Sequence, residues 1–97
     1  MNFTQLMKRQ GKFSISMEAM REKPSDVMVV MSHCLILRAE HHVMSNVVEY
    51  WGCSELFDKI EEGYMVPEYR IKIKETMQDD LCYVDVKAER VEHVLGN

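Results

Sequence analysis

The chain has 97 residues, of which 46% are apolar and 29% charged, and its formal net charge is −4. This length suits one domain with a modest core, so we expect a single domain over residues 1–97. The small negative charge excludes a general nucleic-acid binder and an acidic mimic of nucleic acid. No apolar run approaches the ~18 residues of a membrane span, and the N-terminal segment lacks the apolar core of a signal peptide. We therefore expect a cytoplasmic protein that has no membrane partner.

Cysteine and methionine usage bears on redox state and assembly. The three cysteines, Cys34, Cys53 and Cys82, are odd in number and irregularly spaced, which favours reduced thiols over a disulfide framework. Nine methionines are many for this length, and methionine is typical of adaptable interfaces. We expect a homodimer, because closed two-fold dimers are the commonest way to cover such a surface. Its contact would be the apolar run Val27–Met31 or a sheet edge.

The N-terminal region predicts a short helix near residues 2–9. The following segment, Phe13–Glu18, alternates like a strand, whereas Met17–Lys23 consists of helix-forming residues preceded by a serine. We favour the helix, capped by Ser14 or Ser16.

The central stretch Val27–Trp51 has two interpretations. It predicts either one long helix over residues 26–51 or a short helix over residues 26–33 followed by a hairpin over residues 35–51 that turns at Met44–Asn46. We favour the hairpin, because the first half of the long helix would be apolar on all sides and would need a cover that a short chain barely has.

The C-terminal third contains the clearest strands. Ser54–Gly63 predicts a helical turn or two, or an ordered loop, with Leu56, Phe57 and Ile60 packing inward. Tyr69–Glu75 alternates regularly, Met77–Asp80 is a polar turn, and Leu81–Arg90 alternates again. This pattern predicts an antiparallel hairpin.

Together these elements predict an α+β fold, with short N-terminal helices packed on one face of an antiparallel sheet of about four strands. The alternative is the long helix on a smaller sheet. The predicted inner face consists of Leu35, Leu37, Ala39, Val43, Val48, Tyr50, Ile71, Ile73, Val84 and Val86. The predicted outer face consists of Arg38, Glu40, His42, Glu49, Trp51, Arg70, Lys72, Lys74, Tyr83, Asp85, Lys87 and Glu89.

A dispersed series of residues resembles a pattern in small proteins encoded by tailed bacteriophages. The series comprises Glu49-Tyr50, Ser54, Phe57-Asp58, Glu62-Gly63 and Pro67-Glu68-Tyr69. Such proteins share no common activity, so the resemblance transfers no functional residue. It implies a setting, in which a small accessory protein acts on a host or phage component in the host cytoplasm.

The composition offers little for metal binding or catalysis. The metal-type residues His33, Cys34, His41, His42 and Cys53 lack the close pairs that zinc sites use, and neighbours in a strand point to opposite faces. The paired acids Glu61-Glu62 and Asp79-Asp80 fall in turns, without a histidine or nucleophile beside them. There is no glycine-rich phosphate loop. We expect no metal, no cofactor and no enzymatic activity.

Binding is the remaining class of function. Arg70, Lys72 and Lys74 form a basic row, and aromatic residues on the same face would make a platform for single-stranded nucleic acid. Acidic residues on that face explain the row equally well as cross-strand charge pairing. We therefore favour a protein-binding regulator or inhibitor, with a nucleic-acid or nucleotide binder using Arg70, Lys72 and Lys74 as the alternative. The candidate partner-binding residues are Trp51, Arg70, Lys72, Tyr83, Arg38 and Met31.

Overall fold

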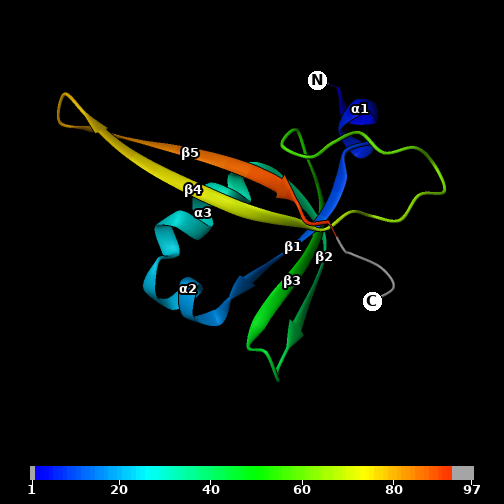
Figure 1. Ribbon diagram of the computed structural model, residues 1–97, viewed down its shortest axis with the longest axis horizontal. Coiled ribbons are helices and arrows are strands. Elements are labelled where there is room, and N and C mark those ends of the chain that lie inside the picture. Colours follow the sequence, from blue (N-terminus) through cyan, green and yellow to red (C-terminus); the bar gives the residue numbers. More distant parts are fainter. Residues whose placement is uncertain (1, 93–97) are drawn as a thin grey trace.

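A computed structural model describes residues 2–92 and confirms the α+β class. Three short helices and five strands follow one another as α1 (Phe3–Met7), β1 (Gln10–Ser16), α2 (Met17–Glu22), α3 (Pro24–Ser32), β2 (Cys34–His42), β3 (Val47–Ser54), β4 (Tyr69–Gln78) and β5 (Leu81–Arg90). The strands form two antiparallel sheets, one in the order β1-β3-β2 and one made of β4 and β5 (Figure 1). The prediction of one sheet with about four strands is therefore wrong.

The ambiguous segment after residue 12 contains both predicted structures in succession. β1 continues to Ser16, and α2 starts at the next residue. The Ser16 hydroxyl oxygen accepts a hydrogen bond from the Ala19 N–H at 3.0 Å, which caps the helix. The alternation from Phe13 marks the strand and the helix-forming residues from Met17 mark the helix, with Ser16 at the boundary between them.

The central stretch is a helix and a hairpin, as favoured above, and the long helix over residues 26–51 is wrong. α3 occupies the first nine residues from Pro24, and β2 then pairs antiparallel with β3. Asn46 closes the connecting turn with φ of 55°, a left-handed conformation that asparagine tolerates. β3 lies in the middle of its sheet because β1 pairs with its other edge.

The predicted inner face of β2 is wrong for its apolar residues. Leu35, Leu37 and Ala39 of β2 are exposed, as is Val43 just after the strand, whereas Ile36 packs against the core. The register between β2 and β3 shifts between Ile36 and Arg38. One extra residue in β2 reverses the alternation of its side chains. Leu35 and Ile36, which precede the shift, therefore point to the faces opposite to those that strict alternation assigns.

The β4–β5 hairpin is confirmed; β5 has the predicted bounds, whereas β4 is longer than predicted. Met77 and Gln78 belong to β4, and the turn consists only of Asp79 and Asp80, with φ of 52° and 63°. Two successive left-handed residues make the type I′ turn that matches the twist of a hairpin. The predicted four-residue turn Met77–Asp80 is wrong, because aspartate can take the left-handed conformation at both central positions.

The two sheets meet near the start of β4. Lys12 forms a parallel bridge with Glu68, and the Lys12 N–H donates to the Pro67 carbonyl oxygen at 2.9 Å. Between the sheets lies a small core whose five buried members are Phe13, Ile15, Val30, Phe57 and Tyr69. Apolar residues of α2, α3 and both sheets pack against these five. The core therefore includes three aromatic residues, two of which come from outside the three-stranded sheet.

The segment between β3 and β4 is an ordered loop that adds Phe57 to the core. The Phe57 ring stacks on Tyr69 at 4.5 Å between centroids and tilts against Phe13 at 6.2 Å. The Arg9 guanidinium donates to the Phe57 carbonyl oxygen at 2.9 Å, and the Asp58 N–H donates to the Tyr69 hydroxyl oxygen at 2.8 Å. Phe57 and Leu56 therefore pack inward as predicted.

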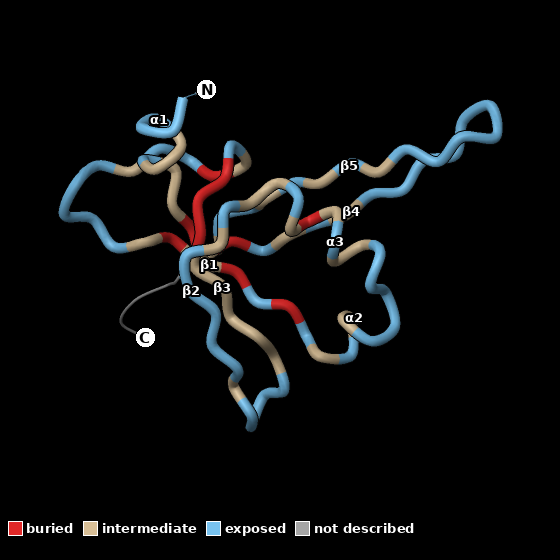
Figure 2. The backbone as a smooth tube through the Cα atoms, turned by 180° about the vertical axis from the view of Figure 1, so that it is seen from behind, coloured by how far each residue is buried: buried red, intermediate tan, exposed pale blue. Residues whose placement is uncertain are grey.

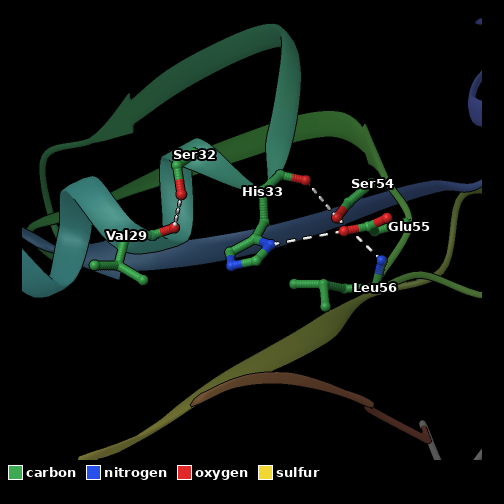
Figure 3. A network of polar contacts seen from close by, with 6 residues as sticks. All are labelled: Val29, Ser32, His33, Ser54, Glu55 and Leu56. Carbon is green, nitrogen blue, oxygen red and sulfur yellow. Dashed lines mark hydrogen bonds and ion pairs between the residues drawn. The ribbon is translucent and has the colours of Figure 1, made fainter. Parts of the chain in front are cut away.

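A buried serine joins the end of α3 to the end of β3 (Figure 3). The Ser54 hydroxyl donates to the His33 carbonyl oxygen at 2.6 Å and accepts from the Leu56 N–H at 3.1 Å. The His33 imidazole lies 3.9 Å from the Glu55 carboxylate. These contacts satisfy backbone groups where α3 ends and the loop begins, so we assign this network a structural role.

The molecule is extended. The outer part of the β4–β5 hairpin projects away from the body, and its end is exposed on all sides (Figures 1 and 2). The radius of gyration is 14.7 Å, against about 12.5 Å for a compact domain of this length. None of the helices among residues 2–92 is long and apolar enough to cross a membrane.

Candidate functional site

The outward side of the three-stranded sheet carries the most promising group of side chains. Directly paired residues share a face, and the registers align Lys12, Trp51 and Arg38 across the sheet, with Ser14, Glu49 and Glu40 in the next row. We call this surface the Trp51 face, defined by Lys12, Ser14, Arg38, Glu40, His42, Glu49 and Trp51. Five of these residues were predicted to lie together, whereas Lys12 and Ser14 were missed because no strand was assigned before the helix over Met17–Lys23.

An aromatic–cation pair lies at the centre of the Trp51 face. The Arg38 guanidinium carbon lies 4.7 Å from the centroid of the Trp51 ring, within the range of a cation–π interaction. The same guanidinium donates to the Glu40 carboxylate at 2.9 Å. The Arg38 side chain is therefore held in one orientation over the half-buried tryptophan, so a partner would pay little entropy to order it.

A second polar pair lies on the same face. The His42 Nε2 atom is 4.0 Å from a Glu49 carboxylate oxygen, too far for a hydrogen bond. Although this nitrogen is buried, it has no hydrogen-bond partner among residues 2–92. Because this nitrogen has no exposed surface, it is not available to a bound molecule.

α1 limits the Trp51 face at one end. The Cys53 thiol lies 3.7 Å from the Met7 sulfur, and Cys53 is fully buried. The sheet surface from Trp51 toward the β2–β3 turn has no such cover within residues 2–92, and Arg38, Glu40 and Ser14 are exposed there. The open part of the face is therefore the part that contains the tryptophan.

The basic row lies on the other sheet, so the expectation that Trp51 shares its face is wrong. Arg70, Lys72 and Lys74 point to one side of β4, and Tyr83 shares that side across the hairpin. Lys72 forms an ion pair with Glu89 at 3.1 Å. Cross-strand charge pairing therefore accounts for part of the row, and one exposed tyrosine remains as its aromatic neighbour.

Met31 is not an open apolar surface. Its side chain is half-buried and packs against the core, whereas Met28 on the same helix is 72% exposed. A charged residue at position 31 would therefore disturb the core as well as any interface.

Metal-type and acidic residues do not converge. Among residues 2–92, no group of three His, Cys, Asp or Glu side chains could hold a metal ion. Asp79 and Asp80 are exposed at the hairpin turn, and Glu61 and Glu62 are exposed in the loop. This arrangement places the acidic pairs in solvent, where carboxylates are stabilised by water.

The three thiols have different environments, which gives a direct test of the structure. Cys82 is exposed, Cys34 is half-buried, and Cys53 is buried; burial raises the pKa of the Cys34 and Cys53 thiols. Since the thiolate is the reactive form, we expect one thiol per native chain to react rapidly with a disulfide reagent at pH 8. Cys82→Ser should remove this fast phase, and all three thiols should react in denaturant. Rapid reaction of two native thiols would contradict the shielding of Cys34, and rapid reaction of all three would contradict the burial of Cys53.

No protein-family model, curated protein or solved structure matches this chain.

Proposed function

We propose that this protein is a small non-enzymatic binding module that regulates or inhibits another protein through the Trp51 face. The setting implied by the resemblance noted above is a phage-encoded protein that acts on a host component. The observation that supports the proposal best is Trp51 with Arg38 held over its ring at 4.7 Å, on an open part of the sheet.

The chemistry of this face supports a protein partner. Tryptophan and arginine are enriched among the interface residues that carry most of the binding energy. Lys12, Glu40 and Glu49 around them carry charges of both signs, so the face has no uniform potential that would attract a polyanion. A central aromatic anchor with a charged surround is the usual anatomy of a protein interface.

A nucleic-acid or nucleotide partner on the basic row is the alternative. Its support is the alignment of Arg70, Lys72 and Lys74 on one side of β4. The ion pair between Lys72 and Glu89 and the separation from Trp51 weaken it. Binding through this row would also fall steeply with added salt, because phosphate contacts release counterions.

Affinity capture from bacterial lysate, with and without nuclease, tests the proposal. We expect a protein that survives nuclease treatment and is lost with Trp51→Ala, whose binding should weaken by about 2 kcal/mol, or roughly 30-fold. Trp51 is the only tryptophan of the chain, so its replacement removes the tryptophan fluorescence that would report folding. Far-UV circular dichroism and thermal unfolding must therefore first show that this variant remains folded.

Tyr64→Ala is the matched control, because it removes another aromatic side chain, 71% exposed, from the loop before β4. It should retain the captured protein. Equal capture by wild type and Trp51→Ala would contradict the proposal, whereas capture that disappears with nuclease and with Lys72→Ala would favour the alternative.

A further inference from the structure

The β4–β5 hairpin has a long unpaired edge. β5 pairs with β4 on one side, and no strand within residues 2–92 pairs with its other side (Figure 1). An open strand edge presents a row of N–H and C=O groups that can pair with another strand. This edge runs over the ten residues of β5.

The turn determines which backbone groups face outward. In a hairpin with a two-residue turn, the pair that flanks the turn is hydrogen-bonded, and hydrogen-bonded and non-bonded pairs then alternate. Gln78 and Leu81 flank the turn. The N–H and C=O groups of Cys82, Val84, Val86, Ala88 and Arg90 should therefore point away from β4.

The outer edge of β4 resists pairing with a copy of itself. An antiparallel pairing around a two-fold axis at Lys72 or Ile73 would place basic side chains opposite basic side chains, since Arg70, Lys72 and Lys74 alternate along the strand. Like charges directly opposite are destabilising. Lysine on a strand edge is a common protection against self-association.

The edge of β5 is complementary to itself. A two-fold axis at Val86 would pair Val86 with Val86 of the second copy. Asp85 of each copy would then lie opposite Lys87 of the other, which makes two contacts between opposite charges. Neither Asp85 nor Lys87 forms an ion pair within residues 2–92. Inside the hairpin, Lys87 lies opposite Lys72, so a facing aspartate would offset an existing repulsion.

We propose that two copies of this chain pair antiparallel through β5 around an axis at Val86, which joins their hairpins into one four-stranded sheet. The inference names the contact of the expected homodimer and is independent of the Trp51 face. In this sheet, the half-buried residues Val84, Val86 and Ala88 of both copies would form a continuous apolar face.

The exposed area agrees with a missing partner. The chain exposes 7481 Å², whereas a compact monomer of 11.4 kDa exposes about 5,800 Å². The six residues outside 2–92 could add at most about 1,000 Å² even if fully extended. The remaining excess of about 700 Å² per chain is close to the ~800 Å² that each partner contributes to a standard interface.

The same axis gives the two exposed apolar residues beside the hairpin turn a neighbour. Met77 and Leu81 are 69% and 57% exposed at the turn. The axis at Val86 brings Leu81 opposite Val91 of the second copy. Val91 lines a surface cavity of about 500 Å³ at the base of β5, together with Met65, Val66 and Pro67. The end of each hairpin would therefore lie beside a hollow of the other copy, whose lining combines these apolar residues with Lys12, Glu68, Arg90 and Glu92.

Light scattering of the full chain across the micromolar range, with wild type and Lys87→Asp, tests the pairing. Wild type should have twice the mass of 11.4 kDa. In Lys87→Asp, the new aspartate faces Asp85 of the second copy at two places, so the dimer should weaken by about 100-fold. The same aspartate faces Lys72 within its own hairpin, so the variant should remain folded.

Mixing of two variants makes the test specific for this register. Asp85→Lys alone should also weaken the dimer, but a mixture of Asp85→Lys with Lys87→Asp should form a heterodimer, because each new charge then faces its opposite. Circular dichroism must show that Asp85→Lys is folded, since its new lysine faces Lys74 within the hairpin.

Lys59→Asp is the control, because it makes the same change of net charge at an exposed loop residue, and it should remain dimeric. A monomeric wild type, a Lys87→Asp dimer of unchanged stability, or a failure of the folded variants to form the heterodimer would each overturn the proposal.

Discussion

Phe57→Ala is expected to lower the free energy of unfolding by about 3–5 kcal/mol, the cost of truncating a buried phenylalanine. The Phe57 side chain is 1% exposed and touches the rings of both Tyr69 and Phe13. A domain of this size has about 5–15 kcal/mol of stability in total. Because only five apolar residues among residues 2–92 form the buried cluster, few neighbouring side chains can move to fill the cavity. Urea unfolding at one protein concentration measures the loss.

Phe3→Ala is the matched control for this substitution. Phe3 is 66% exposed in α1, so the same change of side chain should alter stability by no more than about 0.5 kcal/mol. Equal urea midpoints for the two variants would show that the loop after β3 does not contribute to the core.

Gly52→Ala should lower the free energy of unfolding by about 3 kcal/mol, at the upper end of the usual cost of overpacking. A β-carbon at Gly52 would lie 2.6 Å from the Leu35 carbonyl oxygen. This oxygen belongs to the neighbouring strand, so relief requires β2 to move next to its irregularity between Ile36 and Arg38. We expect reduced thermal stability and faster hydrogen exchange in β2.

Gly63→Ala distinguishes this clash from the general cost of replacing glycine. Gly63 has φ of +91°, and no atom of the described residues outside its chain neighbours would lie within 4 Å of an added β-carbon. Its substitution should cost only the ~1 kcal/mol of an unfavourable backbone conformation. A loss at Gly52 no larger than that at Gly63 would contradict the close approach of the Leu35 carbonyl.

The local patterns of the sequence determined the elements. Alternation in Tyr69–Glu75 and Leu81–Arg90 predicts a hairpin because a strand with one buried face needs that period. The break at Pro24 and the turn ending at Asn46 follow from the backbone conformations that these residues favour. The side chains of the Trp51 face that come from β2 and β3 follow from the same alternation.

The tertiary structure decided how the elements combine. Strand alternation does not specify which strands pair, and it cannot place an irregularity such as the one between Ile36 and Arg38, which exposed Leu35 and Leu37. The separation of Trp51 from Arg70 depends on the division into two sheets. That division depends on Phe57, Phe13 and Tyr69, which come from three different segments and form a core only after the chain has folded.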